Sequence, residues 1–247
     1  MRSFALAISM ALFVGMTAPA AVIWDNYLST NPDNASEWYD GVYALSSERS
    51  TLVTNSWTGD DAIFDSSVTL TGLSWYGLLE KRPNALYTGV DVVVYLKNPD
   101  QEGSYPIAPG AVPVALFTDL AFTERDIADT SFDGGGKQYQ AYEGTVELPE
   151  NVALDPGHYY YSVRMIDNGL GRAYALTTGA GESNPRADTT MAVFQSTFLY
   201  YPDRPNWVYV DQASAMASDY AYRLYGVVPE PASLLLLALG GFALRRR

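Results

Sequence analysis

Residues 159–165 read YYYSVRM, and this short run decides the fold class. The odd positions carry two tyrosines, a valine and a methionine, whereas the even positions carry a tyrosine, a serine and an arginine. Because successive side chains of a strand point to opposite faces, the alternation predicts a strand with one buried face. The turn residues Asp155-Pro156-Gly157 stand just before it, separated from it by His158, and mark its start.

Further strand signals recur through the middle of the chain. Apolar positions 68 and 70 share one parity and positions 73 and 75 share the other, so we predict a bulge or sharp bend at Gly72. Residues 92–96 are continuously apolar, as in a strand covered on both faces. The remaining predicted strands are Val112–Phe117, Gln138–Leu148, Arg172–Thr177, Met191–Tyr200, Trp207–Val210 and Tyr220–Tyr225.

The composition supports a β-rich middle. Tyrosine, phenylalanine and tryptophan, which favour strands, occur 19, 9 and 5 times, and no part of the middle keeps a 3.6-residue apolar period. We therefore predict an all-β fold. Residues 21–227 would form one antiparallel, jelly-roll-like β-sandwich, flanked by an N-terminal signal helix and a short C-terminal hydrophobic helix. Cysteine is absent, which excludes disulfides, and the net charge of −13 argues against a nucleic acid partner.

Residues 1–20 have the three zones of a secretory signal peptide. Arg2 supplies the positive start, and a long apolar stretch follows. Ala18-Pro19-Ala20 then offers an A-x-A cleavage site with small residues at its outer positions. We predict export with cleavage after Ala20; a buried N-terminal helix is the alternative.

Residues 228–247 have the order of a sorting tail. The motif Pro229-Glu230-Pro231 comes first, an apolar stretch at 232–244 follows, and three arginines end the chain. A helix over that stretch would be about 20 Å long, whereas the hydrocarbon core of a bilayer is about 30 Å thick. The segment is therefore short for a permanent span, and the arginines would stay cytoplasmic. An ordinary C-terminal membrane helix is the alternative.

This tail resembles the PEP-CTERM sorting signal of Gram-negative bacteria. The resemblance rests on the motif, the apolar helix and the arginine cluster at the last residue. It implies that an exosortase-type membrane protease recognises Pro229, Glu230 and Pro231. It further implies a transient anchor in the inner membrane and a destination at the cell surface or outside the cell, often alongside exopolysaccharide and biofilm production.

The middle is similar to uncharacterised β-sandwich domains that commonly precede such tails. The similar segments are residues 60–65, 70–77, 154–160 and 219–226. Family members often have Phe where this chain has Tyr222. The resemblance implies a fold and a surface setting, and it carries no activity.

The single histidine, His158, limits the chemistry of the chain. Zinc sites with several histidines are excluded, and a Ser-His-Asp site would depend on this one residue. The acidic residues Asp60, Asp61 and Asp65 are the best local candidates for calcium, but they do not match a known calcium loop and suit a polar turn equally. We predict no catalytic, cofactor-binding or metal-binding residue.

Two roles with carbohydrates stay open. The leading hypothesis is a non-enzymatic surface or matrix protein that binds polysaccharide on an exposed aromatic side chain. Its candidate platforms are Trp24, Trp38, Trp57, Trp75 and Trp207, of which Trp75 is expected in the core and Trp38 and Trp207 at the surface. The alternative is a secreted carbohydrate-active enzyme with a carboxylate pair, for which the acids considered are Glu143, Glu147 and Asp167.

Overall fold

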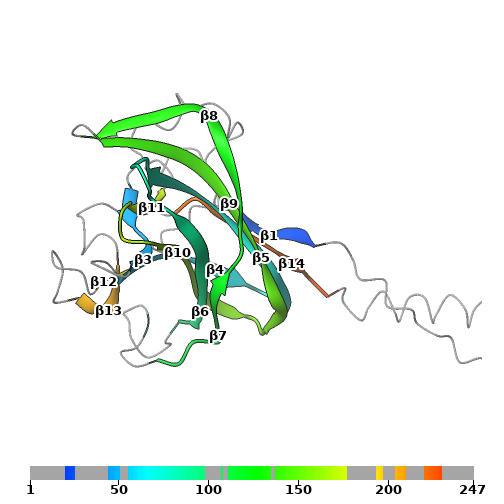
Figure 1. The fold of residues 1–247 in the computed structure, drawn as a ribbon. Helices are drawn as coiled ribbons and strands as arrows, with labels where there is room; N and C mark the ends of the chain where they lie inside the picture. The colour runs from blue at the N-terminus through cyan, green and yellow to red at the C-terminus, as the bar shows by residue number, and fades with distance from the viewer. Residues whose placement is uncertain are drawn as a thin grey trace, which may run out of the picture.

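A computed structural model describes nine parts of the chain. They are residues 20–25, 44–50, 55–97, 107, 111–134, 137–176, 193–196, 204–209 and 220–229. Within these parts the regular structure is all strand, arranged in two seven-stranded sheets (Figure 1). The predicted all-β class is therefore confirmed for the described residues.

The first sheet is built on the long strand β5. One side of β5 pairs with β9, whose outer neighbour is β8. The other side pairs with β14 and, further along, with β11, and these two strands continue to β1 and β2. The strands of this sheet are β1 (Ala21–Asp25), β14 (Tyr222–Val227), β5 (Val68–Glu80), β11 (Ala173–Leu176), β2 (Ala44–Ser46), β9 (Lys137–Leu154) and β8 (Thr123–Gly134).

The second sheet runs in the order β13-β12-β4-β3-β10-β6-β7. All its pairings are antiparallel except the parallel pairing of β3 with β10, which qualifies the predicted antiparallel fold. Its strands are β13 (Arg204–Tyr209), β12 (Val193–Ser196), β4 (Asn55–Phe64), β3 (Glu48–Ser50), β10 (Gly157–Asp167), β6 (Tyr87–Leu96) and β7 (Ala115–Leu120).

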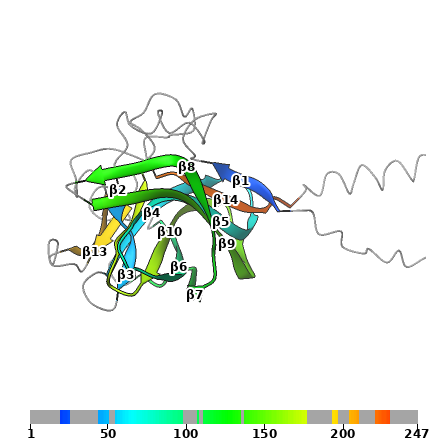
Figure 2. The same cartoon turned by 45° about the horizontal axis from the view of Figure 1, so that its top comes forward.

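The two sheets face each other (Figure 2), and a hydrophobic core with residues from both sheets lies between them. The odd residues of β10 from Tyr159 to Met165 enter this core, as the alternation predicts. From the opposite sheet, Leu73 and Trp75 of β5 enter it, and Trp75 is 2% exposed. The packing fits the predicted β-sandwich. On the outer face of β6, Val93 is buried as well, so the strand centre is covered on both sides as expected.

The predicted irregularity at Gly72 is confirmed. Between Leu70 and Gly72 the pairing with β9 jumps from Val152 to Glu147, so four β9 residues stand opposite one β5 residue. Glycine is needed there because a Cβ atom on Gly72 would lie 2.7 Å from the carbonyl oxygen of Val146. The bulge lets β5 keep apolar side chains in the core on both sides of the parity change.

Other predictions concern residues outside the described parts. The signal helix at 1–20 and the hydrophobic helix at 232–244 lie there, and the jelly-roll connectivity stays a prediction. In the part of the chain that the structure describes, no helix reaches the length and hydrophobicity of a membrane span.

Candidate functional site

The two ends of the domain form a ribbon of two strands. β1 pairs with β14 in antiparallel register, with Ala21 opposite Gly226 (Figure 1). Gly226 allows this close approach, since a Cβ atom there would contact the carbonyl oxygen of Thr69 and lie 2.8 Å from Ile23 Cδ1. The start of β1 and the end of β14 therefore lie at one corner of the sheet.

The residues predicted for processing flank this ribbon. Ala20 precedes β1 directly and is exposed, and Pro229 is exposed two residues beyond the end of β14. Ala18, Glu230 and Pro231 lie outside the described residues. The structure thus places one residue of each predicted processing site beside the same strand pair.

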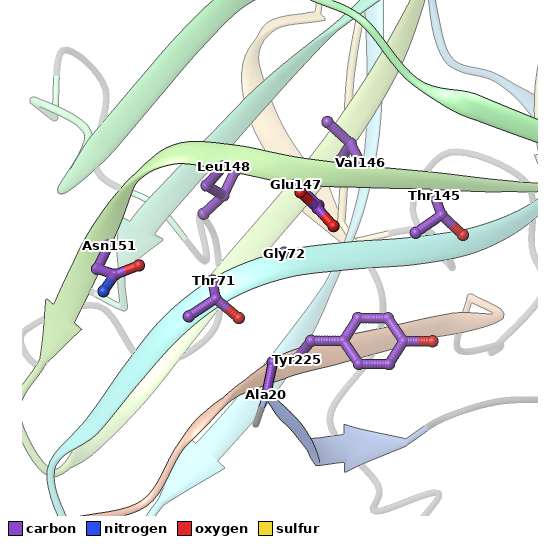
Figure 3. A pocket seen from close by; sticks show the side chains of 9 residues that line it. All are labelled: Ala20, Thr71, Gly72, Thr145, Val146, Glu147, Leu148, Asn151 and Tyr225. Atoms are coloured by element: carbon purple, nitrogen blue, oxygen red, sulfur yellow. The ribbon is translucent and has the colours of Figure 1, made fainter. Parts of the chain in front are cut away.

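A hollow of about 410 Å³ opens at the same corner (Figure 3). It lies where β9 departs from regular pairing with β5, and Tyr225 of β14 closes it on one side. Its lining residues are Ala20, Thr71, Gly72, Thr145, Val146, Glu147, Leu148, Asn151 and Tyr225.

Most of the polar side chains that line this hollow make no interaction within the described structure. Among the described residues, the side chains of Thr71, Thr145, Glu147 and Asn151 have no hydrogen-bonding partner. The Tyr225 phenol lies 3.2 Å from Ser74 Oγ, which holds the aromatic ring in place along the hollow (Figure 3). A fixed ring beside hydroxyl, amide and carboxylate groups is an arrangement that recognises small polar ligands.

The candidate calcium residues do not form one site. Asp60 is buried and accepts a hydrogen bond from the backbone N–H of Tyr220, while Asp61 contacts His158 Nε2 on the opposite face of β4. Asp65 lies in the exposed bend after that strand. In the described parts, no group of three or more histidine, aspartate or glutamate side chains could hold a metal ion.

His158 is held by its neighbours. Its ring contacts Asp61 and stacks on Tyr160 with the ring centroids 5.2 Å apart. No hydrogen bond joins it to a serine in the described ranges. The arrangement fixes a turn-to-strand junction on the outer face of the second sheet.

The tryptophans have different environments. Trp75 is in the core, where its Nε1–H donates to Tyr142 Oη at 2.9 Å, and Trp24 packs edge-on against Phe64 at the core margin. Trp57 is half-buried on the outer face of the second sheet beneath the guanidinium of Arg164. Sequence reasoning placed Trp38 and Trp207 at the surface. Trp38 lies outside the described residues, and Trp207 lies in β13, of which the structure describes only the backbone.

The three acids considered for a carboxylate pair lie apart. Glu147 lines the hollow, while Glu143 pairs with Arg125 at 2.8 Å. Asp167 is buried at the end of β10, where desolvation raises its pKa to about 6 and nearby Glu48 adds to the shift. Backbone donation from Gly169 and the charge of Arg172 act against that shift.

Sequence reasoning missed most of the hollow. Thr71, Thr145, Asn151 and Tyr225 had no individual signal, because their meeting depends on the break in β5–β9 pairing. Proline at position 149, inside β9, was the available clue, since proline within a sheet marks bulges or edges.

Comparison with known proteins adds information about the tail. No curated protein and no solved structure matches the chain. The family model described as the PEP-CTERM protein-sorting motif matches residues 227–247, beginning one residue before the predicted tail. Such motifs mark exported, membrane-associated proteins that exosortase, a membrane protease, processes. The chain therefore carries a C-terminal PEP-CTERM protein-sorting motif that begins at the final residue of β14, Val227.

Proposed function

We propose that this chain is a non-enzymatic cell-surface or extracellular-matrix protein whose β-sandwich binds polysaccharide. The observation that carries the proposal is that the sorting tail and the β-sandwich occupy separate parts of the chain. β14, the last strand of the described residues, ends at Val227, where the family-model match begins, and Pro229 of the Pro-Glu-Pro sequence follows it in an exposed position. A membrane protease could therefore bind and cleave the tail while the β-sandwich stays folded.

A binding role is favoured over hydrolysis by the placement of the acids. Glu147 is the one carboxylate among the described residues that line the hollow. Glu143 is engaged with an arginine, and Asp167 is buried elsewhere. Two carboxyl groups about 5 to 10 Å apart across a sugar would be needed for glycoside hydrolysis.

The sorting role is tested by replacing Pro229, Glu230 and Pro231 together with alanine in the full chain. The expected result is an uncleaved precursor that stays with the membrane fraction, because the protease loses its recognition motif. Val228→Ala is the matched control, since it changes an exposed neighbour and leaves the motif intact. Normal processing of the triple variant, followed by mass spectrometry of the C-terminus, would refute the sorting role.

The binding role is tested on a glycan array with the protein recovered after export. Retention of any matrix polysaccharide supports the proposal, and loss of all binding removes it. The same glycans test the alternative of a carbohydrate-active enzyme, because hydrolysis would release new reducing ends that a colorimetric assay detects.

A further inference from the structure

We infer that the hollow at the β5–β9 bulge is a binding site for a neutral sugar. This inference rests on the proposed polysaccharide-binding function and gives that function a location. The site combines the outward side chains of three neighbouring strands: Thr71 of β5, Thr145 and Glu147 of β9, and Tyr225 of β14 (Figure 3). Asn151 completes it from the irregular part of β9.

The hollow is built into the sheet. Opposite Thr71, the four β9 residues between Glu147 and Val152 leave regular pairing with β5, and this opens the space. Gly72 keeps the floor free of a side chain, because a Cβ atom would meet the backbone of Val146. The volume of about 410 Å³ lies in the range of small-molecule sites.

The lining chemistry matches a sugar ring. Sugars present hydroxyl groups at their edges and C–H groups on their faces. Thr71, Thr145, Glu147 and Asn151 supply hydroxyl, carboxylate and amide groups that are not used inside the described structure. The Tyr225 ring, fixed by Ser74, offers the apolar plate for a sugar face.

The negative charge of the lining and of the whole chain favours a neutral ligand over an acidic one. Glu147 is an acidic side chain in the lining and disfavours an acidic sugar, as does the net charge of −13 carried by the whole chain. Ala20 also borders the hollow and leaves with the predicted signal peptide. The binding groups named above belong to β5, β9 and β14 and remain in the processed protein.

The test measures binding of neutral hexasaccharides of glucose, mannose and galactose by isothermal titration calorimetry. The protein is the processed product recovered after export of the full chain, with hexagalacturonate as the acidic comparison. We expect at least one neutral hexasaccharide to bind and the acidic one to bind at least about tenfold more weakly. Tyr225→Ala and Glu147→Gln should each weaken binding about tenfold, because each removes one recognition group.

Glu143→Gln is the matched control. It makes the same chemical change on the same strand and face, but at a residue outside the hollow. Trp57→Ala on the other sheet tests the competing aromatic platform. Both controls should bind as the unaltered protein does, and near-ultraviolet circular dichroism verifies that each variant is folded.

The outcomes separate the two proposals. If a neutral hexasaccharide binds but Tyr225→Ala and Glu147→Gln stay within twofold of the unaltered protein, the hollow is not the site, while the polysaccharide-binding role stands. If the neutral hexasaccharides fail to bind but the protein binds another glycan on the array, the neutral-sugar assignment is wrong and the polysaccharide-binding role still stands. If no glycan binds in either experiment, both proposals fall.

Discussion

Two acidic side chains on the outer faces of the two sheets, Asp91 and Glu147, have opposite surroundings. On the second sheet, Asp91 is fully buried and receives Arg49 and Arg164 at 2.9 and 2.8 Å, while Arg164 also lies 3.9 Å from the Trp57 ring centroid. On the first sheet, Glu147 lines an open hollow without a partner among the described residues. Polar groups that are paired within the structure stabilise it, and groups left unpaired in a hollow are available to a ligand.

The largest expected change in folding stability comes from replacing Asp91, which is paired with two arginines. Asp91→Asn should lower the free energy of unfolding by about 3 kcal/mol, because two guanidinium groups lose their buried counter-charge. Burial already lowers the pKa of Arg164, and Asp91 acts against this shift. Urea denaturation at pH 7 measures the change.

Asp119→Asn is the control for that variant. Asp119 also contacts Arg49, but its side chain is 69% exposed, so its loss should cost less than about 1 kcal/mol. Asparagine tolerates the positive φ of 57° at this position. Equal losses in the two variants would show that burial does not decide the strength of these pairs.

Asp167 is a buried carboxylate with only one of its oxygens hydrogen-bonded in the described structure. Its Oδ2 atom has no hydrogen-bonding partner among the described residues, and its pKa of about 6 exceeds the unfolded value of about 4. The folded state therefore favours the protonated form, so its contribution to stability is complete below pH 4 and is lost as the pH rises through 6.

The Asp167→Asn variant should be about 2 kcal/mol more stable than the unaltered protein at pH 7 and similar to it at pH 4. The amide oxygen can still accept the backbone hydrogen bond from Gly169. Denaturation at a series of pH values measures both effects. An unchanged pH dependence would assign the titration to another group.

The smallest effect is expected in the hollow. Glu147→Gln should change the free energy of unfolding by no more than about 0.5 kcal/mol, because the carboxylate has no partner to lose within the described structure. Thermal unfolding at neutral pH measures this. A loss of about 2 kcal/mol would show that Glu147 stabilises the fold as Asp91 does, and the contrast between these two residues would disappear.

The sequence predicts those parts of the fold that depend on local alternation. The strand at Tyr159–Met165 and the bulge at Gly72 follow from side-chain parity and are present. β8 was not predicted because its sequence, TERDIADTSFDG, has no apolar alternation. Its place in the sheet comes from its pairing with β9, of which it is the outer neighbour. The hollow was not predicted because it depends on how many residues of β9 stand opposite Thr71, a property of two distant segments together.

The pairing of β1 with β14 has a consequence for the order of events during export. β1 follows the predicted signal peptide and would emerge first from the translocation channel, whereas its partner β14 would be the last of the described strands to emerge. An edge that joins the first and last strands closes only when the domain has crossed. On the predicted export route, completion of the sheet would therefore coincide with arrival of the sorting tail at the membrane.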